Sequence, residues 1–332
     1  MAVLVAGVGY IGAKLVEDLL ARGEKVVAID NFFSTSRRAI ERFCQHERFT
    51  FIKGNITDSR ALSSAFSVAP ISTVYALAAQ ASAHPAAATP RYTENTNLIG
   101  HRLLLDASKA AGAKTIAFAS SFKVYGANLP PVVDESLPYG QFADLSHLSK
   151  CYAEKLLELY ATTHGMRCLA LRLGIVYGMG PVMKRDYRFI TAPNKFCLQA
   201  VRGEQIELNP GANAPTGFIH VSDASRAMID AVDEPLFAGY TPINAVTEVA
   251  SVREVATMVA TEAKKKGLPD VIIKLYGIAE PSSSGQGEQT KSVAPRPRVI
   301  SSLGAPGERP RRTLWESLAE VLDYFKEAGG KD

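Results

Sequence analysis

The chain has little of several features that would narrow its function at once. Among its 332 residues there are only four cysteines and one tryptophan, and the formal net charge is only +4. The cysteines show no C-x-x-C spacing, so neither a zinc site nor a disulfide framework is predicted. They are Cys44, Cys151, Cys168 and Cys197. No group of Asp, Glu and His has the spacing of metal ligands, so no metal is predicted.

Long apolar runs are also missing. No run approaches the length of about 18 residues that a membrane span needs, and an apolar strand pattern already begins at Val3, with no signal peptide before it. The dense basic runs, 264–266 and 309–312, carry no interleaved aromatic residues, which argues against a nucleic-acid partner. We therefore expect a cytoplasmic protein with neither a membrane nor a nucleic-acid partner.

The most informative feature that is present is a glycine motif near the N-terminus. An apolar run over 3–6 is typical of a buried strand, and it leads into Gly7-x-Gly9-x-x-Gly12 and a helical pattern. A second strand pattern then ends on Asp30, which is the arrangement of a dinucleotide-binding fingerprint. The first glycine makes a tight turn, the second admits a pyrophosphate, and the third lets helix and strand pack closely. Asp30 accepts ribose hydroxyls and repels a 2′-phosphate, so NAD is favoured over NADP.

Strand and helix patterns alternate through the first half of the chain, which predicts an α/β fold with a doubly wound parallel sheet, a Rossmann fold. Further strands are expected at 26–29, 49–53, 73–77, 115–119 and 168–173, and helices at 13–22, 91–111, 146–164, 251–266 and 314–328. We predict an NAD-binding domain over 1–178, with a returning strand near 241–247, and a smaller C-terminal substrate lobe over most of 179–332. The segment 281–298 is rich in Ser, Gly and Pro and is predicted to be a surface loop.

Several later segments match one family in order. They are Asp30-Asn31, Gly54-Asn55-Ile56, Leu77-Ala78-Ala79-Gln80, Asn97-Leu98-Ile99-Gly100, Ser120-Ser121-Phe122-Lys123-Val124-Tyr125-Gly126, Ser149-Lys150 and Phe218-Ile219-His220-Val221-Ser222-Asp223. With the glycine motif, these segments make the chain resemble the extended short-chain dehydrogenase/reductases, specifically the NAD-dependent nucleotide-sugar epimerase/dehydratase group. The likeness covers essentially the whole chain, and it implies a doubly wound fold with NAD as cofactor.

The resemblance also implies where the cofactor binds and how two copies of the chain assemble. Asn55 and Ile56 would border the adenine, and Asn97 would hold a helix kink near the active site. The helices over 91–111 and 146–164 would form the interface of a homodimer. The predicted cofactor-binding residues are Gly7, Gly9, Tyr10, Ile11, Gly12, Asp30, Asn31, Asn55, Ile56, Leu77, Ala78, Ala79, Asn97 and Lys150.

The chemistry of that family needs a Ser or Thr, a Tyr and a Lys, and one of the three is missing here. The resemblance places Ser121 at the Ser/Thr position and Lys150 at the Lys position. The family's Tyr lies four residues before the Lys, on the same helix face, and that position holds Ser146. A serine hydroxyl is a far weaker acid than a phenol, whose pKa is about 10, so Ser146 cannot simply replace the Tyr as base. Three nearby tyrosines lie off that position and are weaker candidates: Tyr125, Tyr139 and Tyr152.

Lys123 is the more interesting candidate for the base. It lies two residues after Ser121, and inverting 4,6-dehydratases of the family also lack the Tyr and use a lysine here, preceded by an Asp. In this chain Phe122 replaces that Asp. A lysine that is partly desolvated near NAD⁺ gives up its proton readily, whereas the alternative is an ordinary surface lysine. The predicted catalytic residues are Ser121, Lys123, Ser146 and Lys150.

The nucleotide-sugar side of the site departs from the family as well. An Arg that grips the diphosphate in many relatives is replaced by Thr216, and a frequent Asn is replaced by Ile175. Asn194 matches an Asn that contacts the sugar-nucleotide phosphates. Cations that would compensate are Lys184, Arg185, Arg188, Arg296 and Arg298, and the predicted substrate-binding residues are His84, Ser121, Asn194, Arg185 and Arg296. His147, beside Ser146, is expected on the helix surface or at the dimer interface.

Together these features predict an NAD-dependent enzyme that acts on a sugar nucleotide by transient hydride transfer, as an epimerase or dehydratase. Two alternatives remain open. The missing Tyr suggests an NAD-binding regulatory protein that has lost catalysis. Thr216 and Ile175 suggest instead a dehydrogenase or isomerase whose small-molecule substrate has no diphosphate.

Overall fold

Short apolar runs form the central sheet of the molecule. The computed structural model describes residues 1–82, 84, 86–142, 144–275, 295–304 and 312–329. The sheet has seven strands, all parallel to their neighbours, in the order β11-β7-β5-β4-β1-β2-β3. They are β1 (Ala2–Ala6), β2 (Val26–Asp30), β3 (Phe49–Lys53), β4 (Ile71–Ala76), β5 (Thr115–Ser121), β7 (Arg167–Leu173) and β11 (Tyr240–Ala245). The strand order reverses between β1 and β4, and ligands of such sheets bind at the carboxyl ends of the strands around this point.

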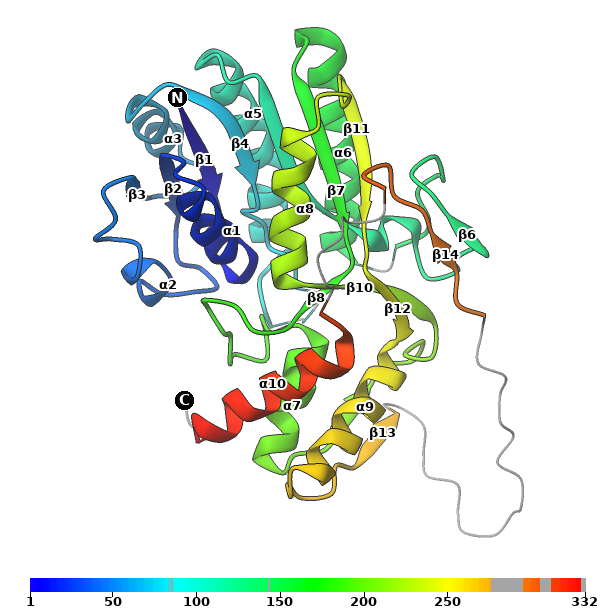
Figure 1. The fold of residues 1–332 in the computed structure, drawn as a ribbon. Helices are drawn as coiled ribbons and strands as arrows, with labels where there is room; N and C mark the ends of the chain where they lie inside the picture. The colour runs from blue at the N-terminus through cyan, green and yellow to red at the C-terminus, as the bar shows by residue number, and fades with distance from the viewer. Residues whose placement is uncertain (83, 85, 143, 276–294, 305–311, 330–332) are drawn as a thin grey trace.

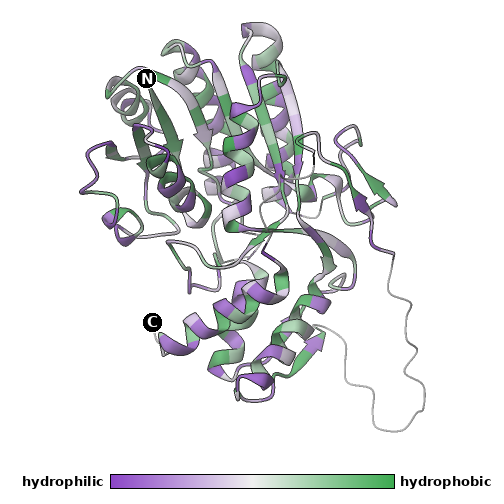
Figure 2. Ribbon diagram, in the orientation of Figure 1, coloured by the Kyte–Doolittle hydropathy of each residue, from purple (hydrophilic) through white to green (hydrophobic). Residues whose placement is uncertain are grey.

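Both faces of the sheet are covered by helices, which explains why the strands are apolar throughout. Val3 and Val5 of β1 belong to one buried cluster, and Leu4 and Ala6 belong to the other. Figure 2 shows β1 hydrophobic along its length, whereas the surface helix α8 alternates between hydrophobic and hydrophilic residues. One face carries α1 (Tyr10–Ala21) and α8 (Val221–Asp233), and the other carries α3 (Ser59–Ser67), α5 (His101–Ala110) and α6 (Leu145–His164). The predicted doubly wound fold is confirmed.

The helix expected over 91–111 is interrupted. It consists of α4 (Pro90–Glu94), a π-helical turn over Asn95–Gly100, and α5. The turn lies where Asn97 accepts a hydrogen bond from the backbone N–H of Gln80 and donates to the carbonyl of the same residue, both at 2.8 Å. Its amide also donates to Ser149 Oγ of α6 at 2.8 Å. The predicted helical stretch is therefore present, and these tertiary contacts hold a π-helical turn at the position predicted for a kink.

A separate set of helices forms a lobe below the carboxyl edge of the sheet (Figure 1). Its core lies between α7 (Ala192–Arg202), α9 (Val252–Lys265) and α10 (Leu314–Glu327). Both α9 and α10 begin with a capping box, Ser251 with Glu254 and Thr313 with Glu316, which satisfies two orphan N–H groups at each helix start. Smaller sheets pair β8 (Ile175–Tyr177), β10 (Pro215–His220) and β12 (Glu248–Ser251), β9 (Ile206–Leu208) with β13 (Ile273–Leu275), and β6 (Val132–Val133) with β14 (Arg298–Val299).

The chain passes between sheet and lobe more than once. After β10 and α8 it returns to the sheet edge, where β11 pairs with β7. The predicted surface loop at 281–298 lies outside the described residues as far as 294, and Arg298 begins β14. Short elements, α2 (Arg38–Glu41) and a 3₁₀ turn over Phe122–Tyr125, complete the described chain. Within the described residues, no helix is long and apolar enough to cross a membrane.

Candidate active site

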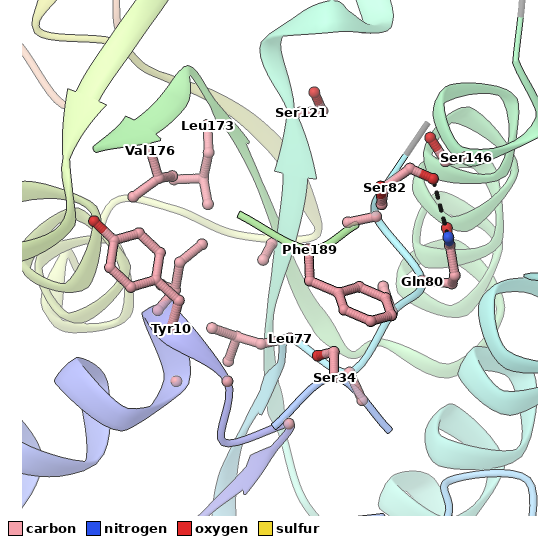
Figure 3. Close-up of a pocket in the computed structure, with 18 of the residues that line it drawn as sticks. Tyr10, Ser34, Leu77, Gln80, Ser82, Ser121, Ser146, Leu173, Val176 and Phe189 are labelled. Atoms are coloured by element: carbon pink, nitrogen blue, oxygen red, sulfur yellow. Dashed lines mark hydrogen bonds between the residues drawn. The ribbon is translucent and has the colours of Figure 1, made fainter. Parts of the chain in front are cut away.

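A cavity of about 460 Å³ opens at the carboxyl ends of β1, β2, β4 and β5, a size typical of sites for small molecules and cofactors. The turn before α1 and the first turn of α6 line it from the sheet side, and the segment 184–192 lines it from the C-terminal lobe. Figure 3 shows Tyr10, Leu77, Ser121, Ser146 and Phe189 around this space. In the part of the chain that the structure describes, no group of His, Cys, Asp and Glu is placed to hold a metal ion.

The glycine turn has the shape that a dinucleotide pyrophosphate needs. Gly7 has a φ of +99°, and a Cβ there would lie 2.5 Å from the backbone nitrogen of Ala78. A Cβ on Gly12 would lie 1.9 Å from the carbonyl oxygen of Gly7. Gly9 precedes α1 and lines the cavity, and a Cβ there would meet only the methyl of Thr35, 4.0 Å away. Two glycines therefore serve packing, and the third leaves open space for an anion at the helix N-terminus.

This difference between the glycines gives a testable prediction. Gly9→Ala is expected to change the free energy of unfolding by no more than about 1 kcal/mol but to raise the Kd for NAD at least about tenfold, because the new methyl enters the cavity. Gly12→Ala is expected to lower thermal stability as well, since a backbone oxygen blocks its methyl. Calorimetric titration with NAD and thermal unfolding of both variants separate the two effects. Wild-type affinity in Gly9→Ala would contradict the placement of the pyrophosphate.

Asp30 lies at the end of β2, and its carboxylate already accepts hydrogen bonds from the protein backbone. Its two oxygens accept hydrogen bonds from the backbone N–H groups of Val8 and Phe32, each at 2.6 Å. Burial raises the pKa of Asp30, while these two bonds and the charge of Lys184 oppose the rise. Lys184 reaches over from the lobe and donates to Ser34 Oγ at 3.2 Å. Burial lowers the pKa of Lys184 to about 8, against the pull of Asp30.

Aromatic rings bring the two parts of the molecule together beside Asp30. Phe33 stacks on Tyr92, with ring centroids 4.0 Å apart, and Phe189 of the lobe meets Phe33 edge-on at 5.6 Å. The amide of Asn31 donates to the hydroxyl of Tyr92 at 3.2 Å. All four residues line the cavity. Sequence reasoning missed this aromatic contact, because Phe33 and Phe189 are far apart in the chain.

Most of the predicted cofactor residues share the cavity. Besides the glycines and Asp30, its lining includes Tyr10, Ile11, Asn31, Asn55, Ile56, Leu77, Ala78, Ala79 and Lys150. Asn97 is not part of the described lining. It lies behind Gln80, which does line the cavity, and holds the loop after β4 through the hydrogen bonds given above.

Lys150 and Ser121 meet in the same cavity from different elements. Lys150 lies on α6 and is only 7% exposed, and its ammonium donates to the carbonyl of Ala119 in β5 at 2.7 Å. Burial lowers the pKa of Lys150 to about 8, although the charge of Glu154 opposes this. Ser121 ends β5, and its hydroxyl accepts a hydrogen bond from the backbone N–H of Lys123 at 3.2 Å. An ammonium group and a hydroxyl are thus held on rigid elements at one site.

The other two predicted catalytic residues also line the cavity, in different environments. Ser146 is buried in the first turn of α6, and its hydroxyl donates to Asp144 Oδ1 at 2.5 Å. Lys123 follows the end of β5, and its side chain is exposed rather than partly desolvated.

The nearby tyrosines do not take the place of the missing phenol. Tyr125 accepts a hydrogen bond from Arg172 at 2.7 Å, and Tyr139 donates to Glu154 at 3.1 Å. Both belong to a buried network away from the described cavity lining, and Tyr152 is 41% exposed on α6. Burial raises the pKa of Tyr125 and of Tyr139, so neither hydroxyl is prepared to exchange a proton with a substrate.

Two of the predicted substrate contacts lie elsewhere. Asn194 is buried in α7, where its amide donates to the hydroxyl of Tyr10 at 3.1 Å and its oxygen accepts from the N–H of Gly178 at 3.1 Å. It therefore joins the lobe to α1 outside the described lining of the cavity. His84 is exposed, with its ring accepting a hydrogen bond from the N–H of Ala86 at 3.1 Å.

The predicted arginines are also engaged outside the described lining. Arg185 lies over the rings of Tyr324 and Phe325, about 6 Å from each centroid. Arg296 pairs with Glu254 at the start of α9, 2.7 Å away. Of the compensating cations proposed from sequence, Lys184 is the one found in the described lining. Thr216 and Ile175, which stand where the resemblance implies an Arg and an Asn, both line the cavity.

His147 is the main correction to the sequence-based expectations. It was expected on the helix surface or at a dimer interface, but it lines the cavity beside Ser146. The reason is that α6 begins at the cavity edge, so its first turn faces inward. Asp144 caps this helix and contacts both side chains. The signal in the sequence is Asp144-x-x-His147, a helix cap whose third following residue carries an imidazole.

Comparisons with known proteins agree with this architecture. UDP-glucose 4-epimerase from Erwinia amylovora is 34% identical over 176 residues, which are 52% of this chain and 52% of that protein, so the match spans about half of the relative. Two solved UDP-glucose 4-epimerases each match 99% of this chain. The structure from Thermotoga maritima with UDP-glucose is 23% identical, is matched over 99% of its own length, and has a TM-score of 0.80. The structure from Thermus thermophilus with NAD is 26% identical, is matched over 100% of its own length, and has a TM-score of 0.78.

The sequence model of one family, described as NAD dependent epimerase/dehydratase, matches residues 3–242. The match contains the glycine turn, Asp30, Ser121 and Lys150, and the family description confirms the predicted cofactor. The chain belongs to the NAD dependent epimerase/dehydratase family.

Proposed function

We propose that the chain is an NAD-dependent epimerase or dehydratase of a sugar nucleotide, with a Ser-Ser-Lys site in place of the family's Ser-Tyr-Lys. The proposal depends on one observation: the glycine turn, Asp30, Ser121 and Lys150 line a single cavity. NAD⁺, when bound, supplies the acceptor for a hydride from the sugar. The cavity residues then have to bind and orient the substrate and move one proton.

The cavity residues divide these tasks by their chemistry. With a pKa of about 8, Lys150 is mostly protonated at pH 7, and it keeps N–H donors beyond the one given to Ala119 for ribose hydroxyls. Ser121 is positioned to hydrogen-bond the hydroxyl that is oxidised. Ser146 fills the position of the missing phenol, with its proton directed to Asp144. Lys123 stays a prediction as a proton-transferring group at the exposed edge of the cavity.

The decisive test is whether a sugar nucleotide reduces the bound cofactor. We expect absorbance in the NADH band to rise, transiently or stably, when the NAD-loaded protein is mixed with one member of a panel of UDP-, GDP- and dTDP-sugars. Ser121→Ala should slow this rise by about 10²-fold or more, as losses of catalytic hydrogen bonds commonly do. Exposed Ser64→Ala on α3 is the matched control. Silence across the whole panel, with NAD demonstrably bound, would refute the proposal.

A second candidate function is favoured by the lining of the substrate side. Thr216 and Ile175 occupy the cavity where many relatives carry an Arg and an Asn, and the predicted arginines lie elsewhere. This arrangement suits an NAD-dependent dehydrogenase or isomerase whose substrate lacks a diphosphate. Competition experiments separate the two functions, because UDP, GDP and dTDP should then fail to displace the substrate. A protein that binds NAD but never reduces it would instead be regulatory.

We further propose a homodimer and a division of labour along the chain. Ile99, Leu148, Tyr152 and Leu159 are between 41% and 53% exposed on the π-helical turn and α6, and burying them against a second copy would remove apolar surface from water. Residues 1–178 with β11 would bind NAD, and most of 179–332 would bind the substrate. Light scattering of the wild type and of a Leu159→Glu variant tests the dimer.

A further inference from the structure

Three polar side chains at the start of α6 form a connected group: Ser146 and His147 line the cavity, and the helix cap Asp144, behind them, contacts both. Asp144 Oδ1 accepts from Ser146 Oγ at 2.5 Å and from the backbone N–H of His147 at 3.0 Å. Asp144 Oδ2 contacts His147 Nδ1. The Asp144 carboxylate thus orients the His147 imidazole. Both residues lie next to Ser146, which stands at the position of the family's Tyr.

The contacts of Asp144 determine which ring nitrogen of His147 carries the proton when the imidazole is neutral. Burial alone would raise the pKa of Asp144, but the hydrogen bonds from His147 and Ser146 outweigh it and keep that pKa well below its usual range. A carboxylate can only accept hydrogen bonds, so the Nδ1 atom facing it must carry a proton. In the neutral imidazole the lone pair is then on Nε2. Nε2 has no hydrogen bond to any described residue, and the side chain is 20% exposed.

Other groups in the cavity are less suited to accept a proton. Ser146 already donates its hydroxyl proton to Asp144, and Lys150 donates to Ala119 as an ammonium. Lys123 is exposed at the edge. The remaining titratable side chains in the described lining lie on other elements and are Tyr10, Asp30, Tyr92 and Lys184. His147 combines access to the cavity with a fixed acceptor nitrogen.

We propose that His147 is the proton acceptor of this enzyme and that Asp144 is its positioning residue, together replacing the missing Tyr; this inference rests on the proposed function. The O–H bond of a substrate hydroxyl breaks and an N–H bond forms at Nε2. The O–H electron pair becomes the second carbon–oxygen bond, and the hydride on that carbon goes to NAD⁺. The alcohol is oxidised to a carbonyl, for which NAD⁺, when bound, would supply the two-electron acceptor, and His147 becomes an imidazolium that Asp144 stabilises.

Asp144→Asn is the sharpest variant, because Asn caps a helix as well as Asp does. Its amide would donate to Nδ1, which moves the ring proton to Nε2 and removes the acceptor. We expect Asp144→Asn and His147→Gln each to slow reduction of the bound cofactor by about 10²–10⁴-fold, measured by stopped-flow absorbance after mixing with the active sugar nucleotide. NAD affinity should stay near the wild-type value. His164→Gln, at the exposed far end of the same helix, is the matched control.

Two further measurements distinguish a role in proton transfer from a purely structural role of His147. Imidazole nitrogen chemical shifts should show the proton on Nδ1 of His147 in the wild type and on Nε2 in Asp144→Asn. Added free imidazole should restore part of the rate of His147→Ala, which a purely structural role would not allow. A proton found on Nε2 in the wild type would overturn the proposal.

The outcomes of these experiments distinguish a failure of the proposed function from a failure of the role proposed for His147. If no sugar nucleotide reduces the cofactor in the wild type, both fail. If the wild type reacts and His147→Gln matches His164→Gln, only the role of His147 is overturned. If Lys123→Gln abolishes the reaction while His147→Gln does not, Lys123 is the base.

Discussion

Replacing Arg172 with methionine is expected to lower the free energy of unfolding by about 3–5 kcal/mol. Arg172 of β7 forms an ion pair with Glu154 of α6, 2.8 Å apart, with 4% and 0% of the two side chains exposed. Ser120 also contacts this carboxylate, and Tyr240 donates to it at 2.9 Å. Burial by itself lowers the pKa of Arg172, but the hydrogen bonds and the charge of Glu154 outweigh burial and raise that pKa above its usual value. Without the guanidinium, Glu154 would be left as an uncompensated buried charge.

Urea unfolding measures this effect, and two variants control it. Lys155→Met removes an exposed ion pair with Glu158 on the same helix and is expected to change stability by less than about 1 kcal/mol. The double variant Arg172→Met/Glu154→Met is expected to recover much of the loss, because no buried charge remains. If Arg172→Met unfolds at the urea concentration of Lys155→Met, the buried pair does not matter for stability.

Lys150→Met is expected to have opposite effects on stability and function. Burial lowers the pKa of Lys150 from 10.5 to about 8, so its charged form at pH 7 costs the fold about 3 kcal/mol. Loss of the ammonium's hydrogen bond to Ala119 offsets about 2 kcal/mol, which leaves a net gain of about 1 kcal/mol for the variant. Reduction of the cofactor by a sugar nucleotide should fall by at least about 10²-fold, since the ammonium in the cavity is lost.

The stability difference should depend on pH in one direction. Below pH 8 both the folded and the unfolded chain hold the proton on Lys150, so the difference is constant. Between pH 8 and 10.5 the unfolded chain binds more protons, so the wild type gains stability as the pH rises, and the advantage of Lys150→Met shrinks and then reverses. Thermal unfolding of wild type, Lys150→Met and Lys155→Met at pH 7 and pH 10 tests this. An advantage of Lys150→Met that grows with pH would contradict the buried ammonium.

The parts of this molecule that local patterns determine could be predicted from the sequence. The apolar runs of the parallel sheet are buried on both faces, so their composition alone indicates them. The glycine turn was equally predictable, because the close approach of Gly12 to Gly7 follows from the strand–turn–helix geometry of the motif. Asp30 was found for the same reason.

What sequence reasoning missed depends on contacts between distant segments. The edge-on contact of Phe33 with Phe189 joins the sheet domain to the C-terminal lobe. The periodicity of hydrophobic residues within a helix or strand cannot predict such a contact. Arg296 was expected at the substrate but pairs with Glu254, since a charged residue near the site in sequence can turn toward any acid within reach. His147 was placed on the surface because its inward direction depends on where α6 begins relative to the cavity.

The contacts of Phe33 with Phe189 and of Ser34 with Lys184 have a thermodynamic consequence. They connect the cavity edge beside Asp30 to the segment 184–192 of the C-terminal lobe. Under the proposed function the dinucleotide binds on one side of these contacts and the substrate on the other. If substrate binding strengthens the contacts, the dinucleotide must in return increase substrate affinity by the same factor. Such linkage favours a cofactor that remains with the enzyme from one turnover to the next.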